Sequence, residues 1–112
     1  MPRFLYHVLT ARADGTEDPY APASLSHEGF IHASYAPSVR ETTELYFSSE
    51  EEIVVLQIDP RQLGVAIDVA ITPRGPMPHV RGPIARRAVV ARFSRETLPE
   101  ILPDFIPALP SG

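Results

Sequence analysis

The chain has 112 residues and a formal net charge of −4, with four histidines and ten arginines but neither lysine nor cysteine. The length allows one domain with a real core and no second domain, and the acidic balance makes nucleic-acid binding through a broad basic face unexpected. The lack of cysteine excludes disulfides, thiolate catalysis and cysteine-ligated zinc. Because no apolar stretch suits a signal peptide or a membrane span, we expect a soluble, cytoplasmic protein.

The first third of the chain contains two short apolar segments separated by a polar stretch. Residues 4–9 (FLYHVL) form an apolar run with aromatic residues, which predicts a buried strand. The polar stretch favours helical turns near residues 10–14 and 23–27, and Gly29 ends the second turn. Residues 30–34 predict another short strand.

Pro37 marks the start of a predicted helix that ends near Ser48, since the missing N–H of a proline would be unpaired in the first turn anyway. Ser38 and Glu41 have the spacing of a capping box. We expect four residues to form the inward face of this helix, namely Val39, Thr43, Tyr46 and Phe47.

The clearest strand in the sequence is residues 52–58 (EIVVLQI), because β-branched residues dominate it. Asp59-Pro60 ends this strand, since proline favours turns and restricts the residue before it. One helical turn is expected at residues 61–63, and a further strand at residues 65–71.

The last third of the chain is rich in proline. Residues 72–78 contain three prolines and one glycine and predict a loop. Residues 88–93 (AVVARF) predict a strand, and residues 96–102 a short closing helix that Pro99 limits. The Pro-rich tail, residues 103–112, is expected to be extended.

Strands scattered among short helices, without an internal repeat, indicate an α+β protein rather than a parallel doubly wound fold. We expect a single domain over residues 1–112, with its core at about residues 4–102.

Three of the four histidines, His7, His32 and His79, lie in strand and loop segments that we expect to converge on one pocket. Imidazole there can hydrogen-bond a ligand, transfer a proton or bind a metal. Gly29 and Gly82 lie near two of these histidines and would let the backbone approach a ligand closely. The fourth, His27, is predicted to be a surface residue or a helix cap. Arginines beside such a pocket would suit a phosphate or a carboxylate.

The residues alone leave the chemistry of this pocket open. Three imidazoles and a water would suit zinc, but the chain has no His-x-His or His-x-x-x-His pair, so no metal is expected. A serine hydrolase is disfavoured because no Gly-x-Ser-x-Gly elbow occurs. Neither a Walker loop nor a Gly-x-Gly-x-x-Gly motif is present.

Together, several of these segments resemble the bacterial family called domain of unknown function 952, over about residues 4–93. The resemblance rests on Tyr6-His7, Tyr20-x-Pro22-x-Ser24-Leu25, Glu28-Gly29-Phe30-Ile31-His32-x-Ser34, Val55-Leu56-x-Ile58-Asp59, Pro78-His79-x-x-Gly82-Pro83 and Ala88-Val89. The chain departs from the family pattern at Met77, where the family usually has an aromatic residue, and at Arg81, where it often has tyrosine. It also lacks a glutamate that the family often carries upstream of the Pro-His block.

This resemblance implies an ADP-ribosyltransferase-like fold, which is a compact, split and curved β-structure with short flanking helices. It implies NAD as a ligand or substrate, with His7 at the adenosine ribose and with His32 and His79 as catalytic residues in the rest of the cleft. The other residues implied to bind the ligand are Tyr6, Gly29, Ser34, Arg81 and Gly82, with Arg81 near a phosphate. The catalytic glutamate of mono-ADP-ribosyltransferases has no clear counterpart in this chain.

We therefore expect a protein that binds NAD or a related nucleotide in a histidine-lined cleft, and that would be an ADP-ribosyl- or phosphotransferase-like transferase if it is an enzyme. The alternatives are a non-catalytic module for a small ligand, a three-histidine metal-dependent enzyme, and an interaction domain whose histidines are hydrogen-bonded core residues. Neither a membrane nor a nucleic acid is an expected partner, and the sequence does not indicate an oligomeric state.

Overall fold

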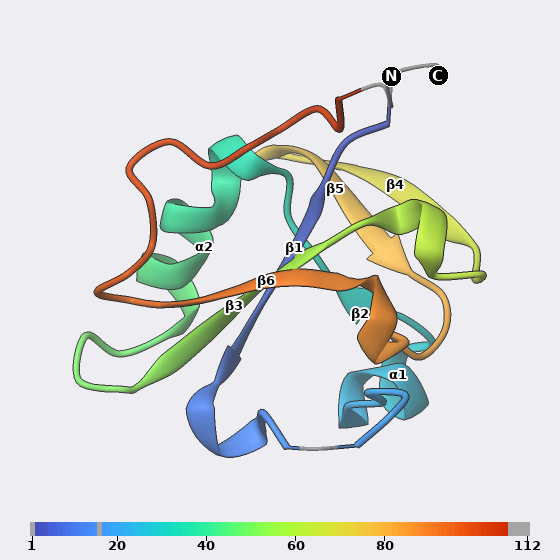
Figure 1. The fold of residues 1–112 in the computed structure, drawn as a ribbon, viewed down its shortest axis with the longest axis horizontal. Coiled ribbons are helices and arrows are strands. Elements are labelled where there is room, and N and C mark those ends of the chain that lie inside the picture. The colour runs from blue at the N-terminus through green and yellow to red at the C-terminus, as the bar shows by residue number, and fades with distance from the viewer. Residues whose placement is uncertain (1, 16, 108–112) are drawn as a thin grey trace.

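Two three-stranded antiparallel sheets form the framework of the computed structural model, which describes residues 2–15 and 17–107 (Figure 1). The first sheet has the strand order β1–β3–β6, with β1 at Leu5–Thr10, β3 at Ile53–Ile58 and β6 at Val89–Ser94. The second has the order β2–β5–β4, with β2 at Ile31–His32, β5 at Gly75–Val80 and β4 at Ile67–Thr72. The predicted α+β class is confirmed.

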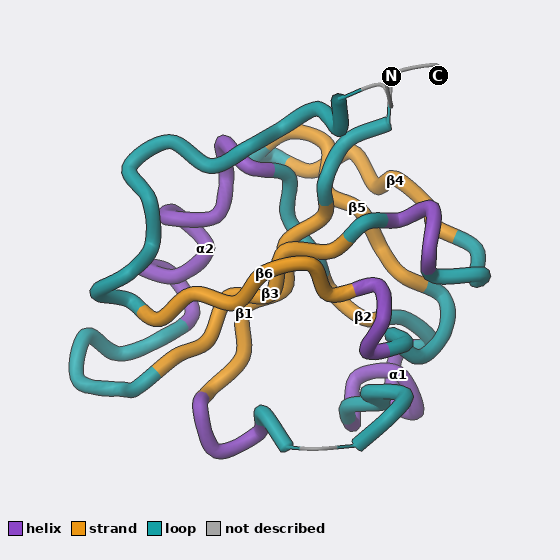
Figure 2. Tube along the Cα trace, viewed as in Figure 1, coloured by secondary structure: helices purple, strands orange, loops and turns teal. Residues whose placement is uncertain are grey.

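The helices are short and lie at the margins of the two sheets (Figure 2). Helix α1 spans Ala23–Glu28, and helix α2 spans Val39–Tyr46. Single 3-10 turns occur at Ala11–Ala13, Ala36–Ser38, Pro60–Gln62 and Arg86–Ala88. None of the helices in the described part of the chain is long and apolar enough to cross a membrane.

Tyr6 and Ser34 join the two sheets. The two residues exchange both backbone hydrogen bonds, at 2.8 Å and 2.7 Å. Strand β1 therefore pairs with β3 along one edge and touches the continuation of β2 along the other. The two sheets diverge on either side of this bridge. His7, which follows Tyr6, and His32, which precedes Ser34, are thereby brought close together.

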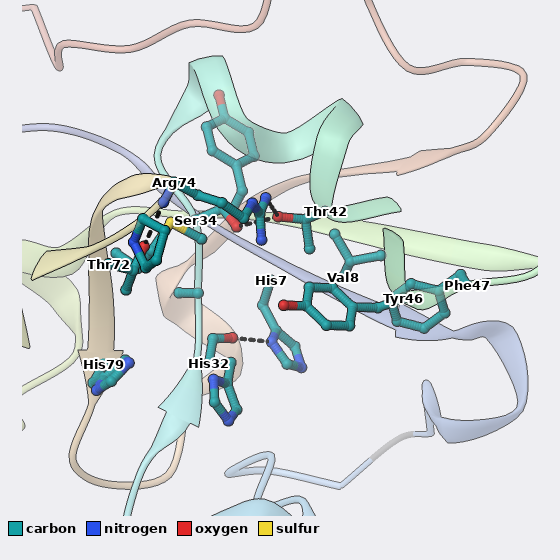
Figure 3. Close-up of a pocket in the computed structure, with 14 residues that line it drawn as sticks. His7, Val8, His32, Ser34, Thr42, Tyr46, Phe47, Thr72, Arg74 and His79 are labelled. Carbon is teal, nitrogen blue, oxygen red and sulfur yellow. Dashed lines mark hydrogen bonds between the residues drawn. The ribbon is translucent and has the colours of Figure 1, made fainter. Parts of the chain in front are cut away.

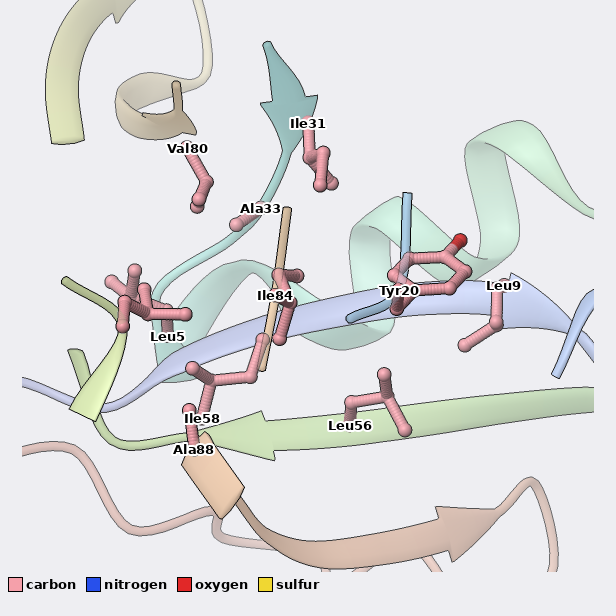
Figure 4. Packing of buried hydrophobic residues seen from close by; sticks show 11 residues of the cluster. Leu5, Leu9, Tyr20, Ile31, Ala33, Leu56, Ile58, Val80, Ile84 and Ala88 are labelled. Carbon is pink, nitrogen blue, oxygen red and sulfur yellow. The ribbon is translucent and has the colours of Figure 1, made fainter. Parts of the chain in front are cut away.

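Strand β1 lies between two hydrophobic cores, which explains why its sequence is apolar at nearly every position. Side chains alternate across a strand, so Leu5 and Leu9 enter one core, which they share with Tyr20, Ile31, Leu56, Ile58, Val80 and Ile84 (Figure 4). Tyr6 and Val8 enter the other, which contains Val39, Ile53, Val55 and Leu102.

The prediction of a loop at residues 72–78 is wrong. These residues turn at Pro73-Arg74 and continue into β5, with Gly75 at φ +97° beside the turn. Pro78 fits within the strand because its carbonyl, which accepts from the Ala33 N–H at 3.1 Å, points away from β4. In an antiparallel strand the nitrogen and the carbonyl of one residue point to the same side. The Pro78 nitrogen therefore also points away from β4, and its missing N–H costs no hydrogen bond to that strand.

Two further local predictions are also wrong. Residues 96–102 form no helix, since Pro99 supplies no N–H and the Ser94–Thr97 hydrogen bonds close a turn instead. Ser38 does not cap helix α2 with its side chain, because the preceding 3-10 turn already gives it helical geometry, at φ −100° and ψ −4°.

The proline-rich tail pairs with the start of the chain as far as residue 107. The Phe4 N–H donates to the Asp104 carbonyl at 2.8 Å, and the Ile106 N–H donates to the Pro2 carbonyl at 2.9 Å. Arg3 donates twice to the Asp104 carboxylate, at 2.7 Å and 3.0 Å. The rest of the predicted tail, residues 108–112, lies outside the described residues.

Candidate functional site

A cavity of about 660 Å³ opens beside the junction of the two sheets. Small-molecule sites commonly have volumes of this size. Its walls come from β1, helix α2, the β4–β5 hairpin and the residues around the end of β2 (Figure 3). Polar groups gather at its two ends, with Arg74 and Thr42 at the upper end of the view and His32 and His79 at the lower end.

Arg74 stands at the turn of the β4–β5 hairpin and reaches across to helix α2. Its guanidinium pairs with the Glu41 carboxylate through Nε and donates through Nη2 to the Thr42 hydroxyl at 2.8 Å. The hydrogen bond that Arg74 donates to the Glu41 carboxylate raises the pKa of Arg74 above its ordinary value, so the side chain is charged. Glu41, predicted to cap the helix, holds this cation instead.

Hydroxyl groups line the wall next to this guanidinium. The Ser34 and Thr42 hydroxyls lie 3.0 Å apart. The Thr72 hydroxyl accepts from the Arg74 N–H at 3.1 Å and donates to the Gly75 carbonyl at 2.8 Å. These bonds fix both the hairpin turn and the direction of Arg74.

At the other end of the cavity, the lining residues His32 and His79 pack with the ring of Phe30, which is not itself a lining residue. The His79 ring stacks on Phe30, with centroids 3.9 Å apart and planes 13° from parallel. His32 stands edge-on to both rings, with its centroid 4.7 Å from Phe30 and 5.6 Å from His79. The cluster forms because His32 and His79 are direct cross-strand partners between β2 and β5.

The two histidines of this cluster have different electrostatic settings. Burial lowers the pKa of His79, and the neighbouring His32 and Arg81 lower it further. His79 is therefore neutral at pH 7. His32 is exposed, and its Nε2 lies 2.9 Å from the carboxylate of Glu28, the last residue of helix α1.

His7 is buried in the wall of the cavity, and both of its ring nitrogens have protein partners. Nδ1 lies 2.7 Å from the His32 carbonyl, which can only accept, so Nδ1 carries the proton. Nε2 then accepts from the Tyr20 hydroxyl at 3.0 Å. Burial lowers the pKa of His7 to about 4, so the ring is neutral and its tautomer is fixed.

Some of the residues that the sequence predicted to bind a ligand line the cavity. These residues are Tyr6, His7, His32, Ser34 and His79. Tyr6 contributes its body rather than its hydroxyl, which donates to the Pro103 carbonyl at 2.6 Å. Burial raises the pKa of the Tyr6 hydroxyl to about 12.

Gly29, Gly82 and Arg81 do not line the cavity, and the structure gives each a local role. Gly29 ends helix α1 in the left-handed conformation at φ +83°. A side chain at Gly82 would meet Val65, since an added Cβ would lie 2.6 Å from the Val65 Cγ1. Arg81 donates to the Asp68 carboxylate at 2.6 Å and lies over the Phe30 ring.

The sequence prediction missed the end of the cavity formed by Arg74, Thr42, Thr72 and Tyr46. Arg74 lies 32 residues from Thr42 along the chain, in a segment predicted to be a loop. The only local sign of a binding residue there was the arginine itself, in the segment Pro73-Arg74-Gly75-Pro76. The hairpin that carries this arginine was not predicted.

Within residues 2–15 and 17–107, no group of three His, Asp or Glu side chains is arranged to hold a metal ion. The three-histidine metal alternative therefore gains no support from this geometry. Among the described residues that line the cavity there is no aspartate or glutamate. Glu28 and Glu41 contact lining residues, namely His32 and Arg74, without lining the cavity themselves.

The fold and the cavity define a class of small α+β proteins with two split antiparallel sheets and a histidine-lined cleft between them. The chain belongs to the family described as "Protein of unknown function (DUF952)", which matches residues 8–92. The predicted membership is thereby confirmed.

Two solved structures have a similar fold. Protein CC0527 from Caulobacter crescentus has a TM-score of 0.67 and 20% sequence identity, over 81% of this chain and 84% of that one. A double mutant of the same protein gives a TM-score of 0.68 with the same identity and coverage. No curated protein matches the chain. These comparisons name no ADP-ribosyltransferase, so that part of the resemblance stays a prediction.

Proposed function

We propose that the cleft binds NAD or a related nucleotide. The observation that carries this proposal is the placement of a fixed guanidinium and a pair of imidazoles at opposite ends of one cavity. A nucleotide offers both kinds of partner, since it joins anionic phosphates to planar polar rings and ribose hydroxyls. The volume of about 660 Å³ suits a ligand of that class.

The phosphate end of the proposed ligand would lie at Arg74. A guanidinium presents a rigid fork of donors that matches phosphate oxygens. Protein groups occupy Nε and Nη2, while no acceptor among the described residues bonds Nη1. The Nη1 donors and the Thr42 and Ser34 hydroxyls are therefore the groups that we assign to the phosphate.

The ring end would lie at His32 and His79, which line the cavity, with Phe30 stacked on the His79 ring. The planar side chains there are already stacked, and aromatic groups pack favourably on such rings in offset or edge-on arrangements. Tyr46 reaches into the cavity from the end of helix α2 and supplies another ring surface (Figure 3). We assign a ribose or a base to this end.

For catalysis, we propose His79 as the base and His32 as the partner acid. His79 is neutral at pH 7 and can accept a proton, and the exposed His32 ring stands edge-on to it, with the two centroids 5.6 Å apart. A positioned general acid or base contributes about 10²–10⁴ in rate, so His32→Gln would lose that factor in a transferase. The lack of a lining carboxylate favours the second candidate, a module that binds the nucleotide without turnover.

Calorimetric titration with NAD, with ADP-ribose and with a 2′-phosphorylated oligonucleotide tests the proposed function. We expect saturable heat from at least one of these ligands. No heat from any of the three at high protein concentration would overturn the proposal. Bound NAD that is recovered unchanged would assign the cleft to the non-catalytic module.

A further inference from the structure

Strand β4 forms one edge of its sheet, and its outer backbone groups lack partners. The Arg81 N–H donates to the Ala66 carbonyl at 2.8 Å, and Thr72 pairs with Gly75 at the turn. Hydrogen-bonded pairs alternate along an antiparallel ladder, so the even-numbered residues from 66 to 72 face β5. The N–H and C=O groups of Ile67, Val69 and Ile71 therefore point outward, where no described residue bonds them.

The side chains along this edge are apolar and uncovered. Val69 is 50% exposed and Ile71 is 83% exposed. Both project from the face that also carries Ile67, which packs against the first hydrophobic core. The apolar face of the sheet thus extends beyond the part that the core covers, and it reaches the unpaired edge of β4.

The other outer edges are protected in ways that natural sheets commonly use. Strand β2 has only two residues, and strand β6 carries Arg92 and has an irregular register against β3 between Gln57 and Ile58. Strand β4 has six residues and no lysine, arginine or proline, and the Arg81 guanidinium already pairs with its one charge, Asp68. A long, apolar edge of this kind is a surface for pairing with another strand.

We propose that β4 pairs antiparallel with β4 of a second copy of the chain, giving a symmetric dimer with one continuous six-stranded sheet. A two-fold axis at Val69 places Val69 opposite itself and Ile67 opposite Ile71 of the second copy. Both pairs are apolar and β-branched, which favours cross-strand packing. The outward backbone groups of both copies are then bonded to each other.

Charge disfavours the neighbouring register whose axis lies at Asp68. With the axis at Val69, Asp68 lies opposite Ala70 of the second copy. An axis at Asp68 would place two carboxylates opposite each other, which destabilises a sheet. We choose a second copy as the partner because the Val69–Val69 and Ile67–Ile71 pairs make this edge complementary to itself. If the partner were a foreign strand instead, the wild-type chain alone would stay monomeric.

Sedimentation velocity over a range of protein concentrations tests the proposal on the full chain. We expect a reversible dimer in wild type. Val69→Lys should raise its dissociation constant at least about tenfold, because the two-fold axis places the introduced ammonium groups opposite each other. Val90→Lys on β6 is the matched control, since Val90 is 52% exposed, and it should leave the dimer intact.

Two further measurements keep the test decisive if Val69→Lys perturbs the fold. Val69→Pro removes an outward N–H and no bond to β5, so it should also give monomers with an unchanged circular dichroism spectrum. An equimolar mixture of V69K and V69E should restore the dimer, because opposite charges then face each other. The proposal is overturned by a wild type that stays monomeric at every concentration, or by a dimer that survives V69K and V69P.

Discussion

The ring of His7 donates through Nδ1 to the main-chain carbonyl of His32 at 2.7 Å, which ties strand β1 to strand β2 between the two sheets. The same ring accepts from the Tyr20 hydroxyl through Nε2. His7 therefore holds the backbone of the segment that presents His32 to the cleft, and it does so as a buried, neutral group.

Stability should fall with acid because of His7. Its pKa is about 4 in the folded chain against 6.5 ordinarily, so the unfolded chain binds the proton first. The stabilisation is complete above pH 6.5 and is lost as the pH falls from 6.5 to 4, by roughly 3 kcal/mol. Urea unfolding at pH 7 and pH 4 should show a smaller loss in His7→Gln, which keeps a donor and an acceptor but does not titrate. Equal losses in the two proteins would contradict this account.

Much of the fold was predictable from local patterns. The runs at residues 4–9 and 52–58 are apolar and β-branched, and they form β1 and β3 within about one residue of their predicted bounds. The β4–β5 hairpin was not predictable in the same way. Whether Pro78 breaks a strand depends on which neighbour its nitrogen faces, and only the tertiary pairing with Ala33 decides that.

The candidate site was predictable only in part, for a related reason. His7, His32 and His79 do line one cavity, because their strands meet at the Tyr6–Ser34 junction. Arg74 reaches that cavity only through the hairpin, so no local pattern could place it there. Gly82 stood out in the sequence as a glycine near a histidine, but its space is filled by Val65.

Substitution of Gly82 should affect stability and leave binding unchanged. In Gly82→Ala, the new methyl group would lie 2.6 Å from the Val65 Cγ1, so we expect a loss of about 1–3 kcal/mol in the free energy of unfolding. Val65→Ala in the same chain should recover part of that loss. If Gly82→Ala is as stable as wild type but binds ligand more weakly, Gly82 belongs to the ligand site instead.

Removal of the Phe30 ring should raise the pKa of His79. Burial is the main cause of the lowered value, and Phe30 covers one face of the imidazole. An NMR titration of Phe30→Ala should therefore give a His79 pKa nearer the ordinary value than in wild type. Phe105→Ala, which alters an exposed ring at the chain termini, serves as the control. An unchanged His79 titration in Phe30→Ala would show that the stack does not set this pKa.

Two arginines allow a direct comparison of the possible phosphate sites. Arg74 lines the cavity and Arg81 does not. If a phosphate lies at Arg74, Arg74→Gln should weaken the binding of ADP-ribose roughly 10- to 100-fold, since hydrogen bonds to charged groups contribute about that much. Arg81→Gln should change it little. The reverse order in calorimetry would return the phosphate to Arg81, where the family resemblance placed it.

The most direct test of the proposed cleft is an NMR titration of the imidazole resonances with NAD. We expect the His32 and His79 resonances to shift together and saturably, while those of His27, which is exposed on helix α1 and outside the cavity, stay in place. If excess NAD leaves His32 and His79 unmoved, or shifts His27 as much as either of them, the cleft does not bind this nucleotide.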